Sequence, residues 1–221
     1  MMYFPAICVD DFYSEPDKVR EWALSLDYKP APEGQWPGKR SEKLHLVDNN
    51  FFNSFCKKVF SLYFDLNITD VDYVVHTQFQ LIEPFDQDPN SIKNTGWVHY
   101  DDDDIFGGII YLTPNIDVNC GTSVFKQLCP SPGITSKEAK QKFYKTGNAE
   151  QYDEILKMHN ECFEETIEYK NKYNRMISFD ANTAHRANSF YTSIPRLTQV
   201  FFVDKCDTTS TYPIHRHRRF L

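Results

Sequence analysis

Several features that mark large classes of proteins are missing from this sequence of 221 residues. No apolar run approaches the roughly 20 residues needed to cross a bilayer. The first residues, Met1 to Pro5, lack the charged start and apolar stretch of a secretory signal peptide. Basic residues are outnumbered, with 24 Lys and Arg against 31 Asp and Glu. A nucleic-acid-binding surface needs a basic stripe that displaces counterions from phosphates. We therefore expect a cytoplasmic protein without a membrane span and without a nucleic-acid partner.

Known chemical signatures are also scarce. The six cysteines are scattered, and no two of them form a Cys-x-x-Cys pair. Without a signal peptide they are expected to be reduced thiols, mostly buried. There is no glycine-rich phosphate loop and no Ser-His-Asp nucleophile signature, which argues against the common nucleotide-binding and serine-hydrolase classes.

Aromatic residues, by contrast, are abundant, at 15% of the chain. They fit pleated, half-buried surfaces and favour a β-rich globular fold. Apolar spacing predicts one helix that Ser14 caps and that continues to about residues 25–27, and a second over 50–64. A loop rich in Pro and Gly separates them at 28–43. Strands are predicted over residues 3–9, 72–82, 106–113, 121–125, 175–180 and 196–203.

Helices followed by closely spaced strands predict a mainly β fold with flanking helices. The expected architecture is a double-stranded β-helix (a jelly-roll, cupin-like fold) with N-terminal helices. The charged stretch 136–174 is interpreted as a helical insertion between strands. Residues 1–221 then form a single domain, with the jelly-roll core over 72–204.

One short motif carries chemistry. In Trp97-Val98-His99-Tyr100-Asp101, the histidine and the aspartate are two residues apart on an extended segment, so their side chains point to the same face. Alone, such a pair is usually a chance hydrogen-bonded arrangement at a strand end. A second histidine, His185, follows a turn at 180–183. Two imidazoles and one carboxylate are the ligands of mononuclear iron sites that keep open positions.

Arg196 follows His185 by eleven residues, at the start of an apolar strand. With these residues the sequence resembles the Fe(II)/2-oxoglutarate-dependent oxygenase superfamily, and most of all its prolyl-hydroxylase-like branch, over roughly residues 72–204. The resemblance implies that His99, Asp101 and His185 are catalytic and bind Fe(II), with 2-oxoglutarate and dioxygen at the remaining positions. It also implies that Arg196 binds the distal carboxylate of 2-oxoglutarate, which a planar guanidinium matches with two hydrogen bonds.

Three further residues are candidates for binding 2-oxoglutarate. Thr198 lies on the same strand face as Arg196 and offers a hydroxyl donor. Tyr111 is on the strand after the iron motif, where the family often places a tyrosine that hydrogen-bonds the co-substrate. The third candidate is Gln78, and Gln80 on the same strand could take its place. The sequence leaves open whether either glutamine is a polar residue of the pocket or faces outward.

The resemblance further implies hydroxylation of a C–H bond in a peptidyl or small-molecule substrate, with release of succinate and CO2. Trp97, Phe202 and the insertion 136–174 are the expected substrate walls, with the insertion as a lid. The alternative is a non-oxidative jelly-roll (cupin-like) metal- or ligand-binding protein. Outside the motif, residues 102–104 are expected to form a solvated acidic turn. No ligand role is expected for the remaining histidines, which are His45, His76, His159, His215 and His217.

Overall fold

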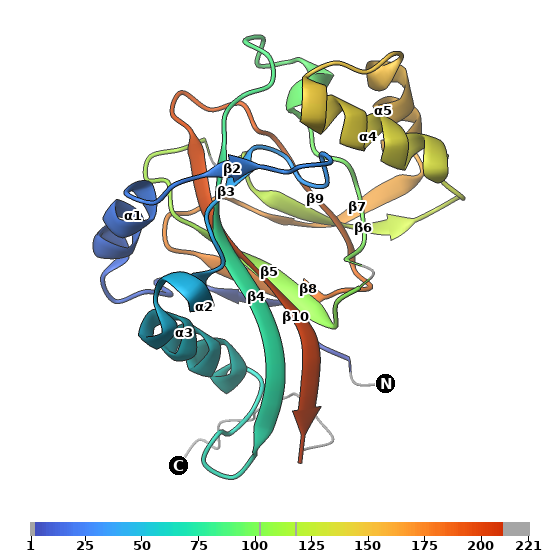
Figure 1. The fold of residues 1–221 in the computed structure, drawn as a ribbon. Coiled ribbons are helices and arrows are strands. Elements are labelled where there is room, and N and C mark those ends of the chain that lie inside the picture. Colours follow the sequence, from blue (N-terminus) through green and yellow to red (C-terminus); the bar gives the residue numbers. More distant parts are fainter. Residues whose placement is uncertain (1–2, 102, 118, 210–221) are drawn as a thin grey trace.

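The computed structural model describes residues 3–101, 103–117 and 119–209, and it contains two antiparallel sheets. The large sheet has the order β1-β8-β5-β10-β4-β3-β2 and the small sheet has the order β7-β6-β9 (Figure 1). The strands of the large sheet are β1 (Ile7–Val9), β2 (Lys29–Pro30), β3 (Lys39–Arg40), β4 (Val71–Ile82), β5 (Phe106–Tyr111), β8 (Met176–Asp180) and β10 (Arg196–Thr208). The strands of the small sheet are β6 (Thr122–Gln127), β7 (Phe163–Tyr169) and β9 (Ala184–Ala187). This arrangement confirms the predicted jelly-roll fold class.

The helices fall into two groups (Figure 1). The N-terminal group, which is α1 (Pro16–Leu24), α2 (Leu44–Val47) and α3 (Asn49–Ser61), covers the outer face of the large sheet. The second group, α4 (Ile134–Thr146) and α5 (Tyr152–Asn160), lies near the small sheet, and a single 3-10 turn spans Ile92–Asn94. Among the described residues, no helix is long and apolar enough to cross a membrane.

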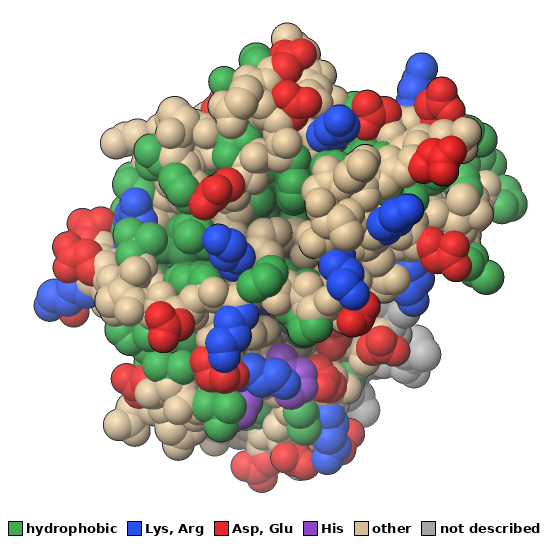
Figure 2. Space-filling view, turned by 45° about the horizontal axis from the view of Figure 1, so that its top comes forward, with side chains coloured by type: hydrophobic (Ala, Val, Ile, Leu, Met, Phe, Trp, Pro, Cys, Tyr) green, Lys and Arg blue, Asp and Glu red, His purple; other side chains and the backbone are tan. Residues whose placement is uncertain are grey.

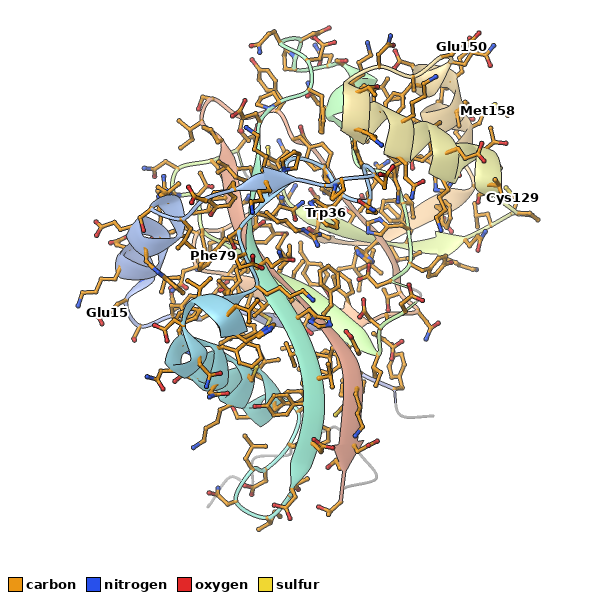
Figure 3. All side chains as sticks on the ribbon, in the orientation of Figure 1. Glu15, Trp36, Phe79, Cys129, Glu150 and Met158 are labelled. Atoms are coloured by element: carbon orange, nitrogen blue, oxygen red, sulfur yellow. The ribbon has the colours of Figure 1, made fainter. Side chains whose placement is uncertain are left out.

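The main core lies between the N-terminal helices and the large sheet. The start of α3 is fixed by Asp48, whose carboxylate accepts hydrogen bonds from the backbone N–H groups of Asn50 and Phe51. The apolar stripe of α3 then packs on alternate residues of β4 and β10. Phe79 shows the arrangement: its ring centroid lies 5.3 Å from that of Trp22 in α1, on the helix side of β4 (Figure 3).

The alternation that buries Phe79 turns the next residues of β4 to the opposite face. In the strand register, Thr198 of β10 lies opposite both Gln80 of β4 and Tyr111 of β5. Two residues further along β10, Val200 lies opposite Gln78 of β4. The candidate 2-oxoglutarate residues therefore share the inner face of the large sheet, which is turned toward the small sheet.

The charged stretch 136–174 was only partly predicted correctly. Its first part is helical, but β7 (Phe163–Tyr169) is a strand that pairs with β6. The prediction was wrong there because β7 is the edge of the small sheet. Edge strands often carry charged residues that discourage pairing with other chains, and most side chains of β7 are exposed. Its glutamates therefore conceal the alternating pattern.

The predicted loop 28–43 also contains two short strands, β2 and β3, and β3 pairs with β4. Two smaller differences concern the N-terminus: β1 covers only Ile7–Val9, and α1 has Glu15 rather than Ser14 at its N-cap. All six cysteines are free thiols; four are buried, while Cys8 and Cys129 are exposed.

Candidate metal centre

Backbone pairing brings the two halves of the predicted iron motif together. His99 and His185 form an antiparallel bridge, in which the N–H of each donates to the carbonyl of the other at 3.0 and 2.9 Å. Their ring centroids are consequently only 4.4 Å apart. The Asp101 N–H donates to the Ala181 carbonyl at 3.1 Å, which holds the carboxylate beside the same pair. Residues 86 positions apart in the chain thus meet at one point between the sheets.

The three side chains present ligand atoms to a common centre. Asp101 Oδ1 lies 3.8 Å from His99 Nε2, and Asp101 Oδ2 lies 3.7 Å from His185 Nε2. One ligand atom from each residue can be chosen so that all lie within 4.8 Å of one another. Two imidazole nitrogens and one carboxylate with an open side form the facial triad of non-haem iron enzymes.

Neighbouring carbonyls orient both imidazoles. His99 Nδ1 lies 2.8 Å from the Trp97 carbonyl oxygen, and His185 Nδ1 lies 2.9 Å from the Thr183 carbonyl oxygen. A carbonyl can only accept, so each Nδ1 carries the proton and each Nε2 keeps its lone pair. Hydrogen bonds of this kind fix the tautomer and ring orientation of metal-binding histidines. Both rings are therefore arranged for metal binding at Nε2.

The protonation state of His99 suits the same role. Its side chain is 41% exposed, although it lies deep between the two sheets and faces the cavity. Desolvation by the surrounding protein, followed by the nearby His185, holds the pKa of His99 well below its usual range. The imidazole is neutral at pH 7, and the neutral form is the one that binds a metal.

A cavity of about 880 Å³ opens from this centre between the sheets. The floor of the cavity is the inner face of the large sheet. Both Arg196 and the triad residues line the cavity. Its roof includes α4 and the segment 31–38 between β2 and β3, which extends toward α4 (Figure 1). Gly34 permits this approach, because its φ is +70° and a Cβ there would overlap the backbone carbonyl of Gln141.

Arg196 has the properties expected of an anion-binding residue. It is only 2% exposed, and its Nε donates to the Cys120 carbonyl at 3.3 Å. Its Nη2 is buried and has no hydrogen-bond partner among the described residues, and the same holds for the Thr198 hydroxyl. Unpaired buried donors are uncommon in folded proteins. Two on one strand face fit the distal carboxylate of 2-oxoglutarate, so the residues present fit this co-substrate as well as the metal.

A family model matches residues 3–189, and its description is a family of unknown function, DUF6445. The chain belongs to this family. No curated protein matches the sequence.

Solved structures resemble this family member in fold. EvdO2 from Micromonospora carbonacea var. aurantiaca, complexed with 2-oxoglutarate, has a TM-score of 0.52 at 11% identity, over 93% of this chain and 88% of that one. EctD from S. alaskensis has a TM-score of 0.51 at 17% identity, over 90% of this chain and 72% of that one. A prolyl hydroxylase from Trichoplax adhaerens, in complex with a hypoxia inducible factor peptide fragment, has a TM-score of 0.50 at 11% identity, over 90% of this chain and 82% of that one. The chain therefore has the double-stranded β-helix fold of the Fe(II)/2-oxoglutarate oxygenases.

The remaining predicted site residues occupy different positions around the cavity. Tyr111 is fully buried on the inner face, and its hydroxyl donates to the Thr122 hydroxyl at 2.8 Å. Thr122 lines the cavity, whereas Tyr111 itself does not. Gln78 lines the cavity, and its side-chain amide donates to the Ser41 carbonyl at 2.7 Å. The roles of Tyr111, Thr198 and Gln78 in binding 2-oxoglutarate stay predictions.

Trp97 and the insertion form one wall, as expected. The Trp97 indole N–H donates to the Tyr152 hydroxyl of α5 at 2.9 Å. The Val98 carbonyl accepts a hydrogen bond from His159 Nε2 at 2.6 Å. No ligand role was expected for His159, and the role that this bond gives it is structural: it ties α5 to the residue next to His99. Whether the insertion moves as a lid stays a prediction.

Sequence reasoning missed several cavity residues. Arg40, Asp104 and His76 all line the cavity. Asp104 is partly buried, so the expectation of a solvated turn is wrong for this residue; Asp102 lies outside the described residues. His76 Nε2 pairs with Asp204 Oδ2 at 2.8 Å, and Lys43 Nζ lies 3.3 Å from His76 Nδ1. Figure 2 shows histidine side chains next to Lys and Arg side chains on the face turned to the viewer. His215 and His217 lie outside the described residues.

Proposed function

We propose that this protein is an Fe(II)/2-oxoglutarate-dependent dioxygenase that hydroxylates a C–H bond of a small-molecule or peptidyl substrate. The observation that carries the proposal is the combination of the triad with the buried guanidinium of Arg196, whose Nη2 has no hydrogen-bond partner among the described residues. The triad alone fits many metal sites. A buried arginine without a carboxylate partner, lining the same cavity, fits a co-substrate that carries its own carboxylate.

Each residue has a definite task in this reaction. His99, Asp101 and His185 would hold Fe(II) through Nε2, one carboxylate oxygen and Nε2. The bound iron would supply activation of dioxygen, with conversion of 2-oxoglutarate to succinate and CO2. Arg196, with the Thr198 hydroxyl, would hold and orient the distal carboxylate. The roof formed by α4 and segment 31–38 would limit access of water to the centre.

The test is anaerobic binding of Fe(II) and 2-oxoglutarate. We expect a weak visible charge-transfer band in the wild-type protein and a much weaker one in Arg196→Ala. The control is Arg186→Gln, because Arg186 also has a buried guanidinium nitrogen without a hydrogen-bond partner, its Nε, but does not line the cavity. Absence of a band in the wild-type protein would contradict the proposal.

Aerobic turnover separates the proposal from the cupin-like alternative. A dioxygenase releases succinate slowly even without substrate, because 2-oxoglutarate is oxidised in an uncoupled reaction. Succinate that depends on both Fe(II) and Arg196 supports the oxygenase. Tight metal binding with no succinate would instead favour a metal-binding protein that retains the triad for another purpose.

A further inference from the structure

A second arginine, Arg40 of β3, lines the same cavity and has no role in the function proposed above. Its guanidinium carbon lies 4.4 Å from the ring centroid of Trp36 and 5.3 Å from that of Phe202. The two aromatic rings come from different parts of the chain, the segment 31–38 and β10. They hold the guanidinium in position, since cations are attracted to aromatic faces. Figure 3 shows Trp36 near the middle of the molecule, in the loop between β2 and β3.

Arg40 has no counter-ion of its own in the part of the chain that the structure describes. Its Nε is buried without a hydrogen-bond partner, and it forms no ion pair with a carboxylate among the described residues. Burial lowers the pKa of Arg40 to about 10, and the charge of Asp101 acts in the opposite direction. Arg40 therefore stays protonated at pH 7. A bound divalent metal ion would offset the charge of Asp101, so that this carboxylate would then compensate Arg40 less.

The position of Arg40 is fixed rather than incidental. β3 pairs with β4, where Arg40 lies opposite Gln80, and the Gln80 amide donates to the Pro37 carbonyl at 2.7 Å. On the roof side, Lys145 of α4 pairs with Glu33 at 2.7 Å. The segment that carries Trp36 is thus attached both to the large sheet and to α4. A buried cation is unfavourable unless something compensates it, and here the fold holds one against the cavity.

Resting on the proposed function, we propose that Arg40 binds an anionic group of the substrate, so that the substrate class is carboxylate-bearing molecules. A planar carboxylate matches the fork of a guanidinium that is already held between two rings. Arg196 and Arg40 then have separate tasks: Arg196 binds the co-substrate carboxylate and Arg40 binds the substrate carboxylate. The triad lies in the same cavity as both arginines.

The experiment compares benzoate with benzamide, which have nearly the same shape but differ in charge. Binding is measured by calorimetry on full-length protein loaded with Mn(II) and 2-oxoglutarate, so that Arg196 is already occupied. In the wild-type protein we expect benzoate to bind at least about tenfold more tightly than benzamide, the lower end for a charge-assisted hydrogen bond. In Arg40→Gln this preference disappears. In Arg40→Lys, which keeps the charge but not the planar fork, an intermediate preference remains.

Arg186→Gln again serves as the matched control. The Arg186 guanidinium lies 5.0 Å from the Phe125 ring centroid, but it does not line the cavity, so this variant should keep the wild-type preference. Equal binding of benzoate and benzamide to the wild-type protein, including no binding of either, would overturn the proposal. So would a full preference in Arg40→Gln.

A further variant separates this proposal from the proposed function. In metal-free Arg196→Gln the co-substrate anchor is absent, and Arg40 is the remaining arginine among the described residues that line the cavity. Benzoate preference in this protein supports the Arg40 site even if 2-oxoglutarate fails to bind the wild-type protein. Loss of preference in Arg196→Gln, with normal 2-oxoglutarate binding to the wild-type protein, would show that Arg196 rather than Arg40 binds the benzoate.

Discussion

Replacing Arg196 with methionine should separate stability from co-substrate binding. Methionine has a similar length and no charge, so Arg196→Met removes the buried guanidinium while filling most of its space. If the role of Arg196 were structural, its removal would destabilise the folded protein. An arginine held for a ligand should be dispensable for folding and essential for binding 2-oxoglutarate.

The magnitude follows from the contacts of Arg196. The variant loses the hydrogen bond from Nε to Cys120, about 1.5–3 kcal/mol for a charged donor, and the cation–π contact with Tyr111 at 5.5 Å, about 1–2 kcal/mol. The variant also no longer buries a desolvated charge, and that desolvation destabilises the folded wild-type protein by several kcal/mol. Burial lowers the pKa of Arg196, in line with that desolvation. We expect the metal-free variant to be as stable as the wild-type protein, or more stable by up to about 2 kcal/mol.

Thermal unfolding in the presence of a chelator, and then with Mn(II) and 2-oxoglutarate, measures both effects. For a chain of this size, 1 kcal/mol corresponds to about 2–4 °C in Tm. The metal-free variant should therefore unfold at the wild-type Tm or up to about 8 °C above it. At 2-oxoglutarate concentrations 100 times the Kd, the wild-type protein should gain about 2.7 kcal/mol, or about 5–11 °C, and the variant, which has lost the partner of the distal carboxylate, should gain much less.

Two results would refute this reasoning. A fall of more than about 4 °C in the metal-free variant would mean that the guanidinium is needed for folding, so its unpaired Nη2 would not indicate a ligand. An undiminished shift with 2-oxoglutarate would mean that the co-substrate carboxylate is bound elsewhere, for which Arg40 would be the first candidate.

Three further predictions concern the centre and its wall. Asp101→Asn should weaken Mn(II) binding at least about hundredfold, measured by calorimetry, because it removes the anionic ligand of the triad. Loss of a residue that only hydrogen-bonds a metal ligand already weakens metal binding about 10–100-fold. Wild-type affinity in this variant would contradict the metal site. Burial, Asp204 and Asp101 raise the pKa of Asp104 to about 7, above its unfolded value of about 3.9, so the contribution of Asp104 to the stability of the metal-free protein should fall from about pH 4 to 7, while the lowered pKa of His99 contributes in the opposite direction. Asp104→Asn should therefore make the slope of Tm against pH more positive in this range than in the wild-type protein, and an unchanged slope would contradict the assignment to Asp104. Trp97→Phe should destabilise by about 1–3 kcal/mol in denaturant unfolding, because it leaves the buried Tyr152 hydroxyl without its donor; a change below about 0.5 kcal/mol would mean that the bond is not formed in solution.

The sequence predicted those parts of the fold in which local pattern and burial agree. Along β4 the alternation between Phe79 and its neighbours Gln78 and Gln80 separates a face that packs on helices from a face that lines a cavity. The period-two spacing of His99 and Asp101 predicted a shared face, and the structure places their ligand atoms together. Such patterns are visible because one face is apolar and the other is not.

The missed elements have no such pattern. β3 consists of two residues, Lys39 and Arg40, which is too short for any periodicity, and only its pairing with β4 makes it a strand. Arg40 was therefore assigned to a loop. β7 was concealed by charges that belong to an edge strand. In both cases the information lies in the tertiary partner, which neighbouring residues in the sequence do not specify.

The two arginines also differ in how they can be found. Arg196 follows His185 by eleven residues in the sequence, so the family pattern extends to it. Arg40 comes from a segment before the jelly-roll core, attached to α4 through Glu33 and Lys145. A residue contributed by such a segment can change without disturbing the triad or Arg196. On the present proposals the co-substrate anchor lies on β10 and the substrate anchor on β3, so substrate preference should change with Arg40 and Trp36 while 2-oxoglutarate binding does not.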